Sequence, residues 1–572
     1  MQGMGLAPLP RIQGERIHVS ALDRTDPPPP ALGHHSSSRE RLLLVALVAG
    51  ALGIRLIWLA AHHGPLGTES TYYARLGENL AAGRGWLGMR EQGLQLFYPP
   101  LYPLLIAAAT WVVHSGVIAG RVVSLLLGSL LVIPVWALAR RMAGPRIACI
   151  AAVLAVIHPL LIATSTAVLS DTAYLCFAAC GWVWGLRMIE TDGWPWPILA
   201  GVSGGLAYLT RPEGLVFPVL LLALLAAGFV RGRIPLARRA ALALGAFAAT
   251  GAPYVIWLFT LTGQVHLETK SAENFEFARR IAAGLSPSQA SHEIADDLTE
   301  VGLSMRPNVV NLETLRAPLK QRLRFFAETV RSYGPRILRS LASGPAFGAP
   351  ITVALAFLGW FGVPWDRERR RHELYLFAWL GLALLPLLSL EHFSERFALS
   401  FLALLLVPMA RGVDQVRRWA AATGTSDASP AARGVFTAVP WIAVAALVAL
   451  SLRGLPDVLD LQPSDPQEVA LASWIQAHAE GHERIVDAGP VVAYYAGAAV
   501  TSFPYASSET ALRYLAKQGV GFIVLRGNQH VAPYVEDWIS HGIPDSRATL
   551  AYRTTTASGA EIQIYRFRAG AS

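Results

Sequence analysis

Long apolar stretches alternate with short polar stretches along most of the chain. Eleven of the apolar stretches are long enough to cross a bilayer, whose hydrocarbon core requires about 20 predominantly apolar residues. They cover residues 42–61, 117–139, 146–164, 172–189, 195–210, 214–230, 240–261, 347–363, 373–390, 396–411 and 435–453. The stretch Leu101–Val113 is shorter, and a run of this length is more often re-entrant or interfacial than spanning. The pattern predicts a polytopic α-helical membrane protein of about eleven spans with additional juxtamembrane helices.

Composition supports a chain that is largely dissolved in lipid. Charged residues make up 15% and hydrophobic residues 53% of the sequence, whereas a soluble domain has roughly 25% charged residues. Mean hydropathy is +0.40. The net charge of +9 comes from basic residues in short clusters between apolar runs. Such clusters are topology signals, so we predict no nucleic-acid partner.

The positions of the arginine clusters predict the orientation in the membrane. If Leu101–Val113 does not cross, every dense cluster lies on the cytoplasmic side, as the positive-inside rule requires. These clusters lie at residues 140–146, 231–239, 367–371 and 411–418. We therefore predict a multi-pass protein of the plasma or inner membrane with a cytoplasmic N-terminus. Residues 1–40 contain four consecutive prolines and predict a disordered tail before an uncleaved first span.

Three large polar regions then lie on the extracytoplasmic side: residues 62–116, residues 262–346 and residues 454–572. The domain division that follows is a tail (1–40), a transmembrane catalytic module (41–453) and an outer domain (454–572). Within the first region, Glu69–Ala82 has helical character, and Pro99-Pro100 prevents helix continuity before the short apolar stretch.

The outer domain mixes amphipathic helical stretches with short strand-like runs, which predicts a small α/β domain. The helical stretches are Glu468–Ala479 and Glu509–Gln518. The strand-like runs are Ile485–Asp487, Gly521–Leu525 and a pair within residues 548–567 around a turn at Ser558-Gly559.

Four groups of ionisable residues lie at helix ends that this topology places on the same outer face. An ionisable group near the membrane interior costs about 2.5–3.5 kcal/mol at a helix centre and is commonly functional. The groups are Glu69, Ser170-Asp171, Arg211-Pro212-Glu213 and residues 391–396, which include His392 and Arg396. Carboxylates and arginines at a lipid–water boundary suit an anionic lipid headgroup, because the planar guanidinium pairs with phosphate oxygens.

Each of these residues also has a purely structural interpretation. Glu69 would be a favourable charge at the start of a surface helix. Asp171 would be the N-cap of the span that follows it. Arg211-Pro212-Glu213 would be a turn between two spans, with Pro212 at a first helical position. His392 would be a solvated loop histidine.

The cysteines do not predict a metal site or disulfides. Cys149, Cys176 and Cys180 all lie in apolar stretches, and none lies in the long polar regions. Cys176 and Cys180 have i, i+4 spacing, but no histidine or acid nearby completes a zinc-ligand pattern. We predict small packing residues and no zinc site.

Several separated motifs give the chain a resemblance to the GT-C superfamily of membrane glycosyltransferases. The branch it resembles contains protein O-mannosyltransferases and the lipid A aminoarabinose transferase, and is of the glycosyltransferase family 39 type. The matching elements cover roughly residues 42–411. They are Glu69, Ser70, Tyr73, Asn79, Leu80, Gly83-Arg84-Gly85-Trp86, Tyr98-Pro99-Pro100-Leu101-Tyr102-Pro103, Ser170-Asp171, Arg211-Pro212-Glu213-Gly214 and Arg396.

The resemblance implies an inverting transfer from a polyprenyl-phosphate sugar donor. It implies that Glu69 is the catalytic base, although that branch usually has aspartate at this position. It also implies that no divalent metal is required for lipid-monophosphate chemistry, and we predict no cofactor.

We predict that Glu69 deprotonates an acceptor hydroxyl and that Asp171 assists or positions it. Arg211 and Arg396, with Lys270, hold the donor phosphate. Lys270 is included because it is the lysine at the start of the second outer region, where a juxtamembrane helix would bring it over the site. The remaining predicted substrate-binding residues are Tyr73, Glu213 and His392.

Two other functions stay open at this stage. A transporter or lipid flippase should carry polar groups through the bilayer, whereas the helix interiors here are nearly uncharged apart from Arg55. An inactive lipid-binding relative would account for glutamate at the usual aspartate position. The sugar, the acceptor hydroxyl (protein, glycolipid or glycan) and the oligomeric state do not follow from the sequence.

Overall fold

The computed structural model of this protein describes residues 38–62, 64–305, 319–388, 394–423, 430–458, 466–527, 531–556 and 559–568. The chain divides into two compact units, residues 1–43 and residues 44–572, and the site and the cavities described below lie in the second. The predicted N-terminal tail lies outside the described residues, except for Ser38–Glu40 in α1.

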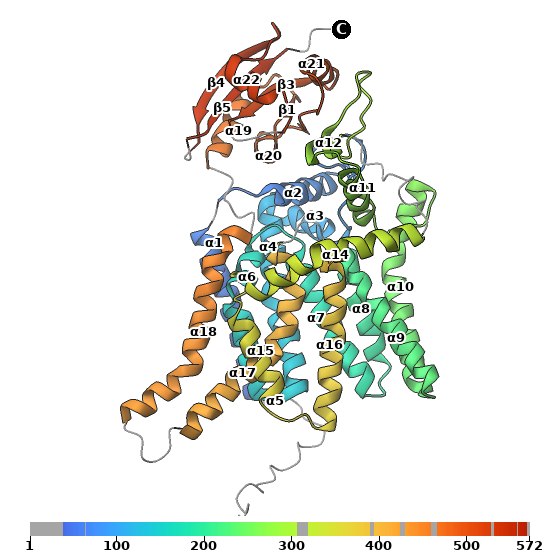
Figure 1. Ribbon diagram of the computed structural model, residues 1–572, viewed down its shortest axis with the longest axis vertical. Helices are drawn as coiled ribbons and strands as arrows, with labels where there is room; N and C mark the ends of the chain where they lie inside the picture. Colours follow the sequence, from blue (N-terminus) through green and yellow to red (C-terminus); the bar gives the residue numbers. More distant parts are fainter. Residues whose placement is uncertain are drawn as a thin grey trace, which may run out of the picture. The chain divides into compact units, whose positions relative to one another are not determined.

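Helices make up most of the chain, as the apolar pattern predicts (Figure 1). The helices up to the second outer region are α1 (Ser38–Ala61), α2 (Thr68–Ala81), α3 (Leu101–Val113), α4 (Gly116–Leu130), α5 (Val132–Ile157), α6 (Pro159–Thr166), α7 (Asp171–Glu190), α8 (Pro195–Thr210), η1 (Pro212–Leu215), α9 (Val216–Val230), α10 (Ile234–Thr262), α11 (Lys270–Ala282) and α12 (Pro287–His292). Those that follow are α14 (Leu319–Ser343), α15 (Ile351–Phe361), α16 (Arg367–Leu388), η2 (Glu395–Ala398), α17 (Leu399–Thr423) and α18 (Pro430–Val458).

The polytopic helical fold is confirmed. Seven helical runs in the described part of the chain are long and apolar enough to cross a membrane: Ser38–Ala61, Gly116–Ile157, Asp171–Glu190, Pro212–Val230, Ile234–Thr262, Glu395–Ala422 and Ala438–Leu455. Each of the eleven predicted stretches contains helix, but some helices are too short for this criterion: α8 has 16 residues and α15 has 11. Parts of two predicted stretches join in Gly116–Ile157, where Gly144 at φ +84° and Pro145 introduce a kink.

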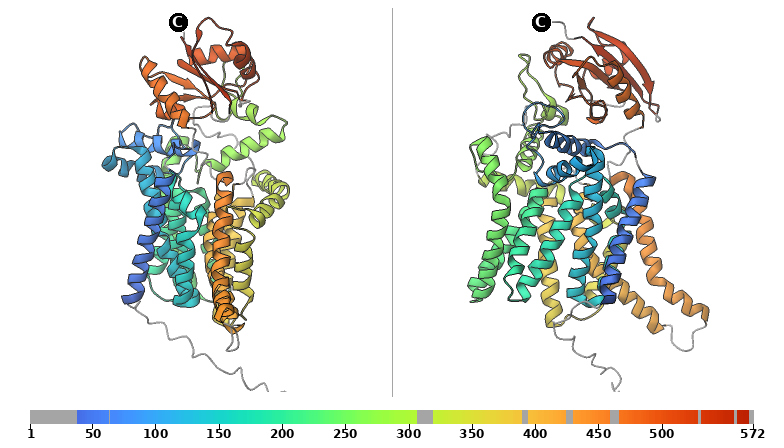
Figure 2. Two further views of the ribbon diagram at one scale, coloured as in Figure 1. Left: turned by 90° about the vertical axis from the view of Figure 1, so that its left-hand side faces the viewer. Right: turned by 180° about the vertical axis from the view of Figure 1, so that it is seen from behind.

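The first outer region forms α2 and α3, as predicted, and the helix break falls at Pro100. The two helices pack on each other and on α4, across the ends of the long helices (Figures 1 and 2). They place the residues of α2 directly above the start of α7.

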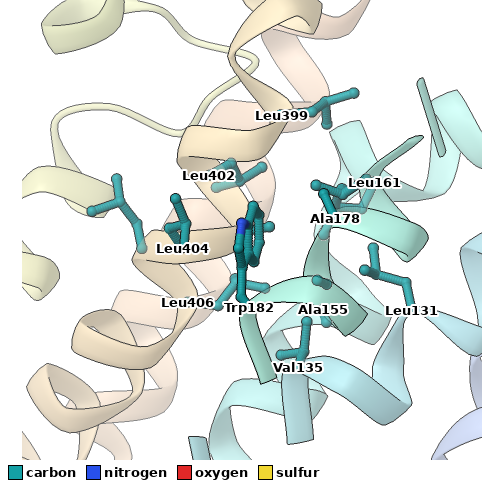
Figure 3. Packing of buried hydrophobic residues seen from close by; sticks show 14 of the residues in the cluster. Leu131, Val135, Ala155, Leu161, Ala178, Trp182, Leu399, Leu402, Leu404 and Leu406 are labelled. Atoms are coloured by element: carbon teal, nitrogen blue, oxygen red, sulfur yellow. The ribbon is translucent and has the colours of Figure 1, made fainter. Parts of the chain in front are cut away.

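Close packing of small residues positions α17, the helix that follows Arg396. A Cβ atom added at Gly359 of α15 would clash with the carbonyl oxygen of Pro408, and one added at Gly412 of α17 would clash with that of Leu355. Such backbone contact between helices is typical of membrane proteins, where small residues let helices approach closely. Around Trp182, leucines of α17 interdigitate with residues of α5 and α7 (Figure 3).

The C-terminal α/β domain is confirmed and contains a five-stranded sheet in the order β2-β1-β3-β5-β4. Its elements are α19 (Pro466–His478), β1 (Arg484–Val486), α20 (Val491–Tyr495), β2 (Val500–Thr501), α21 (Ser508–Lys517), β3 (Val520–Arg526), α22 (Val535–His541), β4 (Ala548–Thr555) and β5 (Glu561–Phe567). Strand β1 pairs in parallel with β2 and β3, whereas β5 is antiparallel to β3 and β4. The sequence did not indicate α20, β2 or α22, because each is short.

A buried ion pair ties β3 to β1 in this domain. Arg526 donates from Nη2 to Asp487 Oδ2 at 2.8 Å and from Nη1 to Glu468 Oε1 at 2.8 Å, and the Asp487 side chain is fully buried. We expect Arg526→Met to reduce the free energy of unfolding of this domain by about 3–5 kcal/mol, because it leaves a buried carboxylate unpaired. Thermal unfolding of the full-length protein, followed by tryptophan fluorescence, measures this.

Arg547→Met is the matched control for Arg526→Met. The Arg547 side chain is 37% exposed and pairs with Asp545 on the surface, and exposed ion pairs contribute about 0–1 kcal/mol. Equal destabilisation by both substitutions would contradict the structural role assigned to Arg526.

Candidate active site

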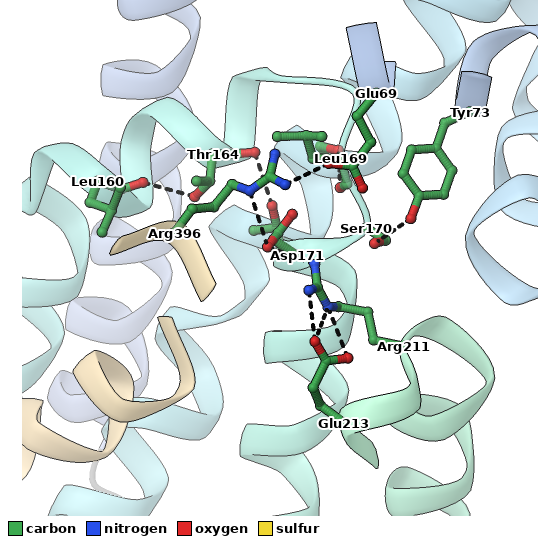
Figure 4. Close-up of polar contacts among 12 residues, drawn as sticks. Glu69, Tyr73, Leu160, Thr164, Leu169, Ser170, Asp171, Arg211, Glu213 and Arg396 are labelled. Carbon is green, nitrogen blue, oxygen red and sulfur yellow. Dashed lines mark hydrogen bonds and ion pairs between the residues drawn. The ribbon is translucent and has the colours of Figure 1, made fainter. Parts of the chain in front are cut away.

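Glu69 lies in the first turn of α2, where a negative charge is favoured by the helix dipole. Its Oε2 accepts a hydrogen bond from Arg396 Nη2 at 2.5 Å (Figure 4). The Glu69 side chain keeps 24% of its surface exposed. Glu69 is therefore more than a helix-end charge, since it pairs with a cation from a distant part of the sequence and stays accessible.

Asp171 and Arg211 form a buried ion pair below Glu69. Asp171 is the first residue of α7, and Arg211 follows the last residue of α8. Arg211 Nη1 donates to Asp171 Oδ1 at 2.8 Å, and the two side chains are 7% and 4% exposed. Ser170, and not Asp171, is the N-cap of α7. The Asp171 carboxylate is thus turned toward Arg211 and does not cap the helix.

One oxygen of Asp171 is left without a hydrogen bond. Its Oδ2 atom is buried and has no partner among the described residues. An unsatisfied buried acceptor costs free energy, which a hydroxyl donor from a substrate would recover.

Glu213 anchors Arg211 from the opposite side. Arg211 Nη2 donates to Glu213 Oε1 at 2.8 Å, within the short helix η1 that joins α8 to α9. The turn interpretation of Arg211-Pro212-Glu213 is therefore also correct, with Pro212 at the first helical position. The same turn aims the guanidinium of Arg211 at Asp171 (Figure 4).

Arg396 completes the cluster. It lies in η2, just before α17, and its Nε is 3.9 Å from Asp171 Oδ1. The phenyl ring of Phe397 lies 5.2 Å from the guanidinium carbon of Arg396 and 5.9 Å from that of Arg211. An aromatic ring at this distance attracts a cation through its π face. Sequence reasoning missed Phe397, although its position directly after Arg396 was an available signal.

Tyrosines of the first outer region surround the carboxylates. The Tyr73 hydroxyl lies 2.8 Å from Ser170 Oγ, and the Tyr73 ring is 4.4 Å from that of Tyr98. Burial, followed by the negative charge of Glu69, raises the pKa of Tyr73 and Tyr98 well above the ordinary value. These phenols therefore remain neutral hydrogen-bonding groups at physiological pH.

Lys270 is the first residue of α11, and its Nζ lies 5.1 Å from the centre of the Phe97 ring. Within the described residues, no hydrogen bond or ion pair joins Lys270 to the carboxylates. Its positive charge is one of those that lower the pKa of Glu69. His392 lies outside the described residues.

Opposing effects set the pKa of Glu69. Burial alone would raise it, but the positive charges of Arg396, Lys270 and Arg211 outweigh burial and hold the pKa below the ordinary glutamate value. Glu69 is consequently ionised at neutral pH and able to accept a proton.

A cavity opens beside the two arginines. Its lining includes Asp171 and Glu213 together with apolar side chains from α9, α16 and α17, namely Val216, Ala383, Pro386, Leu387 and Leu399. The lining combines arginines with apolar side chains, as a lipid phosphate requires, but the open space is about 20 Å³, so such a ligand must displace side chains of the wall.

No group of three or more His, Cys, Asp and Glu side chains in the part of the chain that the structure describes is placed to hold a metal ion. The positive charges beside Glu69 and Asp171 are guanidinium groups.

Comparison with known proteins was made for both sequence and fold. The profile of a family described as dolichyl-phosphate-mannose-protein mannosyltransferase matches residues 98–257, which is less than half of the chain. No curated protein matches the sequence closely enough to serve as a relative.

Solved structures of two membrane glycosyltransferases share the fold. The archaeal oligosaccharyltransferase AglB from Archaeoglobus fulgidus, in complex with an inhibitory peptide and a dolichol-phosphate, has a TM-score of 0.54 and 15% identity over 85% of this chain and 69% of its own. ArnT from Cupriavidus metallidurans, bound to undecaprenyl phosphate, has a TM-score of 0.54 and 13% identity over 92% of this chain and 98% of its own. The chain has the GT-C fold.

The resemblance to GT-C membrane glycosyltransferases is confirmed by the family match and the shared fold. Together they support glycosyl transfer as the type of reaction. A GT-C protein with seven helical runs able to span a membrane is a multi-pass membrane protein. The roles of individual residues rest on the geometry above.

Proposed function

We propose that this protein transfers a sugar from a polyprenyl-phosphate donor to an acceptor hydroxyl, on the extracytoplasmic face of the membrane and with inversion at the anomeric carbon. The observation that carries the proposal is the pair of buried arginines beside two carboxylates, at the mouth of an apolar-walled cavity. Guanidinium groups bind phosphate oxygens, and apolar walls accept a lipid tail.

Glu69 is the proposed base. It removes the proton of the acceptor hydroxyl while the acceptor oxygen attacks the anomeric carbon of the donor sugar. The bond between that carbon and the phosphate oxygen breaks, and its electron pair leaves with the lipid phosphate. A single displacement of this kind inverts the anomeric configuration.

Arg396 and Arg211 are the proposed phosphate ligands. A guanidinium has five N–H donors, and Arg396 Nε has no hydrogen-bond partner among the described residues. Arg396 can therefore bind a phosphate oxygen while it still contacts Glu69. Lys270 adds positive charge above the site, and Asp171 holds both arginines in place. Glu213 lines the cavity beside them, and Tyr73 contacts Ser170, the residue before Asp171.

The arginine charges could replace a divalent cation in the reaction. Because guanidinium groups already neutralise Glu69 and Asp171, we propose that the leaving phosphate is stabilised without a divalent cation. The reaction should then proceed unchanged in EDTA.

The test uses purified full-length protein in lipid nanodiscs with radiolabelled polyprenyl-phosphate sugars. We expect release of lipid phosphate, with slow hydrolysis when no acceptor is added, both with and without EDTA. The matched nucleotide sugars and polyprenyl-diphosphate sugars are controls, and we expect no turnover of either.

Two outcomes would overturn the proposal. Turnover of nucleotide sugars alone would show another donor class. Binding of polyprenyl-phosphate sugars without any turnover would favour an inactive lipid-binding relative.

A further inference from the structure

A second cavity lies beside Tyr98, in the first outer region. Its volume is about 150 Å³. Its walls come from the first outer region, from α11 and from residues 303–304, and the side chains used below are Tyr72, Arg90, Gln95, Tyr98, Glu273 and Ser304. It shares no lining residue with the apolar-walled cavity at Arg211 and Arg396.

Tyr98 connects this cavity to the proposed base. Its ring is 4.4 Å from that of Tyr73 and 6.3 Å from that of Tyr72. After burial, the negative charges of Glu69 and Glu273 are among the causes that raise the pKa of Tyr98. Tyr72, which lines the cavity, lies three residues after Glu69 on α2, so the two side chains share one face of that helix.

The chemistry of the walls suits a hydroxylated ring. A cavity of about 150 Å³ holds one six-membered ring. Two phenols, one carboxylate, one guanidinium, one amide and one hydroxyl supply both donors and acceptors around it. Arg90 and Glu273 have opposite charges, so the lining favours neither an anion nor a cation.

Glu273 is available for such a ligand. Burial raises its pKa, although the charges of Arg90 and Lys270 oppose this. Its carboxylate makes no hydrogen bond or ion pair within the described part of the chain. A carboxylate in this position needs a donor, and the hydroxyl groups of a sugar provide several.

The C-terminal domain holds the rim of the cavity. Arg90 Nη2 donates to Ser502 Oγ at 2.8 Å, and Arg484 Nη1 donates to the Arg90 carbonyl at 2.6 Å. The backbone N–H of Val500 donates to the Met89 carbonyl at 2.8 Å. The wall formed by residues 88–90 therefore depends on this domain.

The second outer region is held in the same way. The backbone N–H of Tyr505 donates to the His292 carbonyl at 2.6 Å, and the Tyr514 hydroxyl donates to Glu300 Oε1 at 2.8 Å. His292 and Glu300 both lie shortly before Ser304 in the chain, so these contacts hold the segment that leads to Ser304. The C-terminal domain thus braces two separate walls of one cavity.

We infer that this cavity, between Arg90 and Glu273, binds the acceptor as a single neutral sugar ring, and that the C-terminal domain sets its shape. This inference rests on the proposed function. It selects a saccharide hydroxyl over a protein hydroxyl, because an extended peptide needs a groove with partners for its backbone groups.

The test measures binding of methyl pyranosides to full-length protein in nanodiscs by saturation-transfer NMR, without any donor. We expect binding by wild type and a loss of about tenfold or more in Glu273→Gln and in Arg90→Gln, since each removes a charged hydrogen-bonding partner. Glu91→Gln and Arg84→Gln are matched controls, because both side chains are exposed on the same loop. We expect wild-type binding in both.

Donor hydrolysis in the same variants separates this inference from the proposed function. We expect the controls Glu91→Gln and Arg84→Gln to hydrolyse the donor at the wild-type rate, and thermal unfolding of Glu273→Gln and Arg90→Gln at the wild-type temperature shows that these two variants are folded. Equal pyranoside binding in wild type and Glu273→Gln would overturn the acceptor site, as would binding of a serine-containing peptide without binding of any pyranoside. If the wild-type protein does not hydrolyse the donor at all, the proposed function is overturned instead.

Discussion

Glu69→Gln should lower kcat by about 10²–10⁴-fold, the contribution typical of a positioned general base. Glutamine keeps the size and the hydrogen-bonding shape of the side chain but cannot accept the proton. The Glu69 side chain is partly exposed and already ionised. Its carboxylate can therefore accept the proton of the acceptor hydroxyl without first losing a proton of its own. The measurement is single-turnover transfer from a polyprenyl-phosphate sugar in nanodiscs.

Two further variants make the Glu69 result interpretable. Glu69→Asp keeps the carboxylate with a side chain one methylene shorter, so we expect it to retain more activity than Glu69→Gln. Glu91→Gln removes an exposed carboxylate of the same outer region and should leave kcat unchanged. Wild-type kcat in Glu69→Gln would exclude Glu69 as the base and would move the assignment to Asp171.

Arg396→Gln should lower kcat/KM by about 30-fold to 10³-fold. Truncating one member of a buried charge pair typically costs about 2–4 kcal/mol, and each 1.36 kcal/mol is a factor of ten in rate. The substitution removes a proposed phosphate ligand and leaves Glu69 without its nearest cation. Initial rates as a function of donor concentration give kcat/KM directly.

The pH dependence of the same variant tests the pairing independently. The base must be deprotonated in the free enzyme, so kcat/KM is retained above the pKa of Glu69 and is lost as the pH falls through it. In wild type, Arg396 is the first of the charges that hold this pKa below the ordinary value, against burial. Without Arg396, less positive charge opposes burial, so the pKa of Glu69 rises and the acidic limb of the profile should move to higher pH.

Arg396→Lys is the control for this shift. Lysine keeps the positive charge but loses the planar fork of donors. We therefore expect kcat/KM to fall while the acidic limb moves less than in Arg396→Gln. An acidic limb that stays at the same pH in both variants would show that the pH profile does not report Glu69.

The site predicted from the sequence consists of ionisable residues at helix ends. The sequence predicts Glu69, Asp171 and Arg211 as site residues because a charge near lipid is costly unless it is paired or functional. The structure brings them within one cluster with Arg396 and Glu213. The sequence could not indicate the partners, since Glu69 could equally have paired with Arg211 and Asp171 with Arg396.

Residues without charge were harder to find. Phe397 lies beside both guanidiniums, and Tyr98 lines the second cavity. Neither produces a periodic or compositional signal, because an aromatic residue in an apolar chain is ordinarily a packing residue. The predicted phosphate contact of Lys270 stays a prediction: α11 places its ammonium over Phe97, and its charge helps to lower the pKa of Glu69.

The sequence by itself determined that the chain is a polytopic helical protein, where most of its helices lie, and that an α/β domain follows them. It could do so because hydropathy and helix-breaking residues act locally, within a span of about 20 residues. Only the tertiary structure decided which acid pairs with which arginine, that the loops at residues 88–90 and 292–304 meet the C-terminal domain, and that two cavities with separate linings form. Those relations join residues that are far apart in the chain, and they arise from helix packing and sheet pairing that no local pattern specifies.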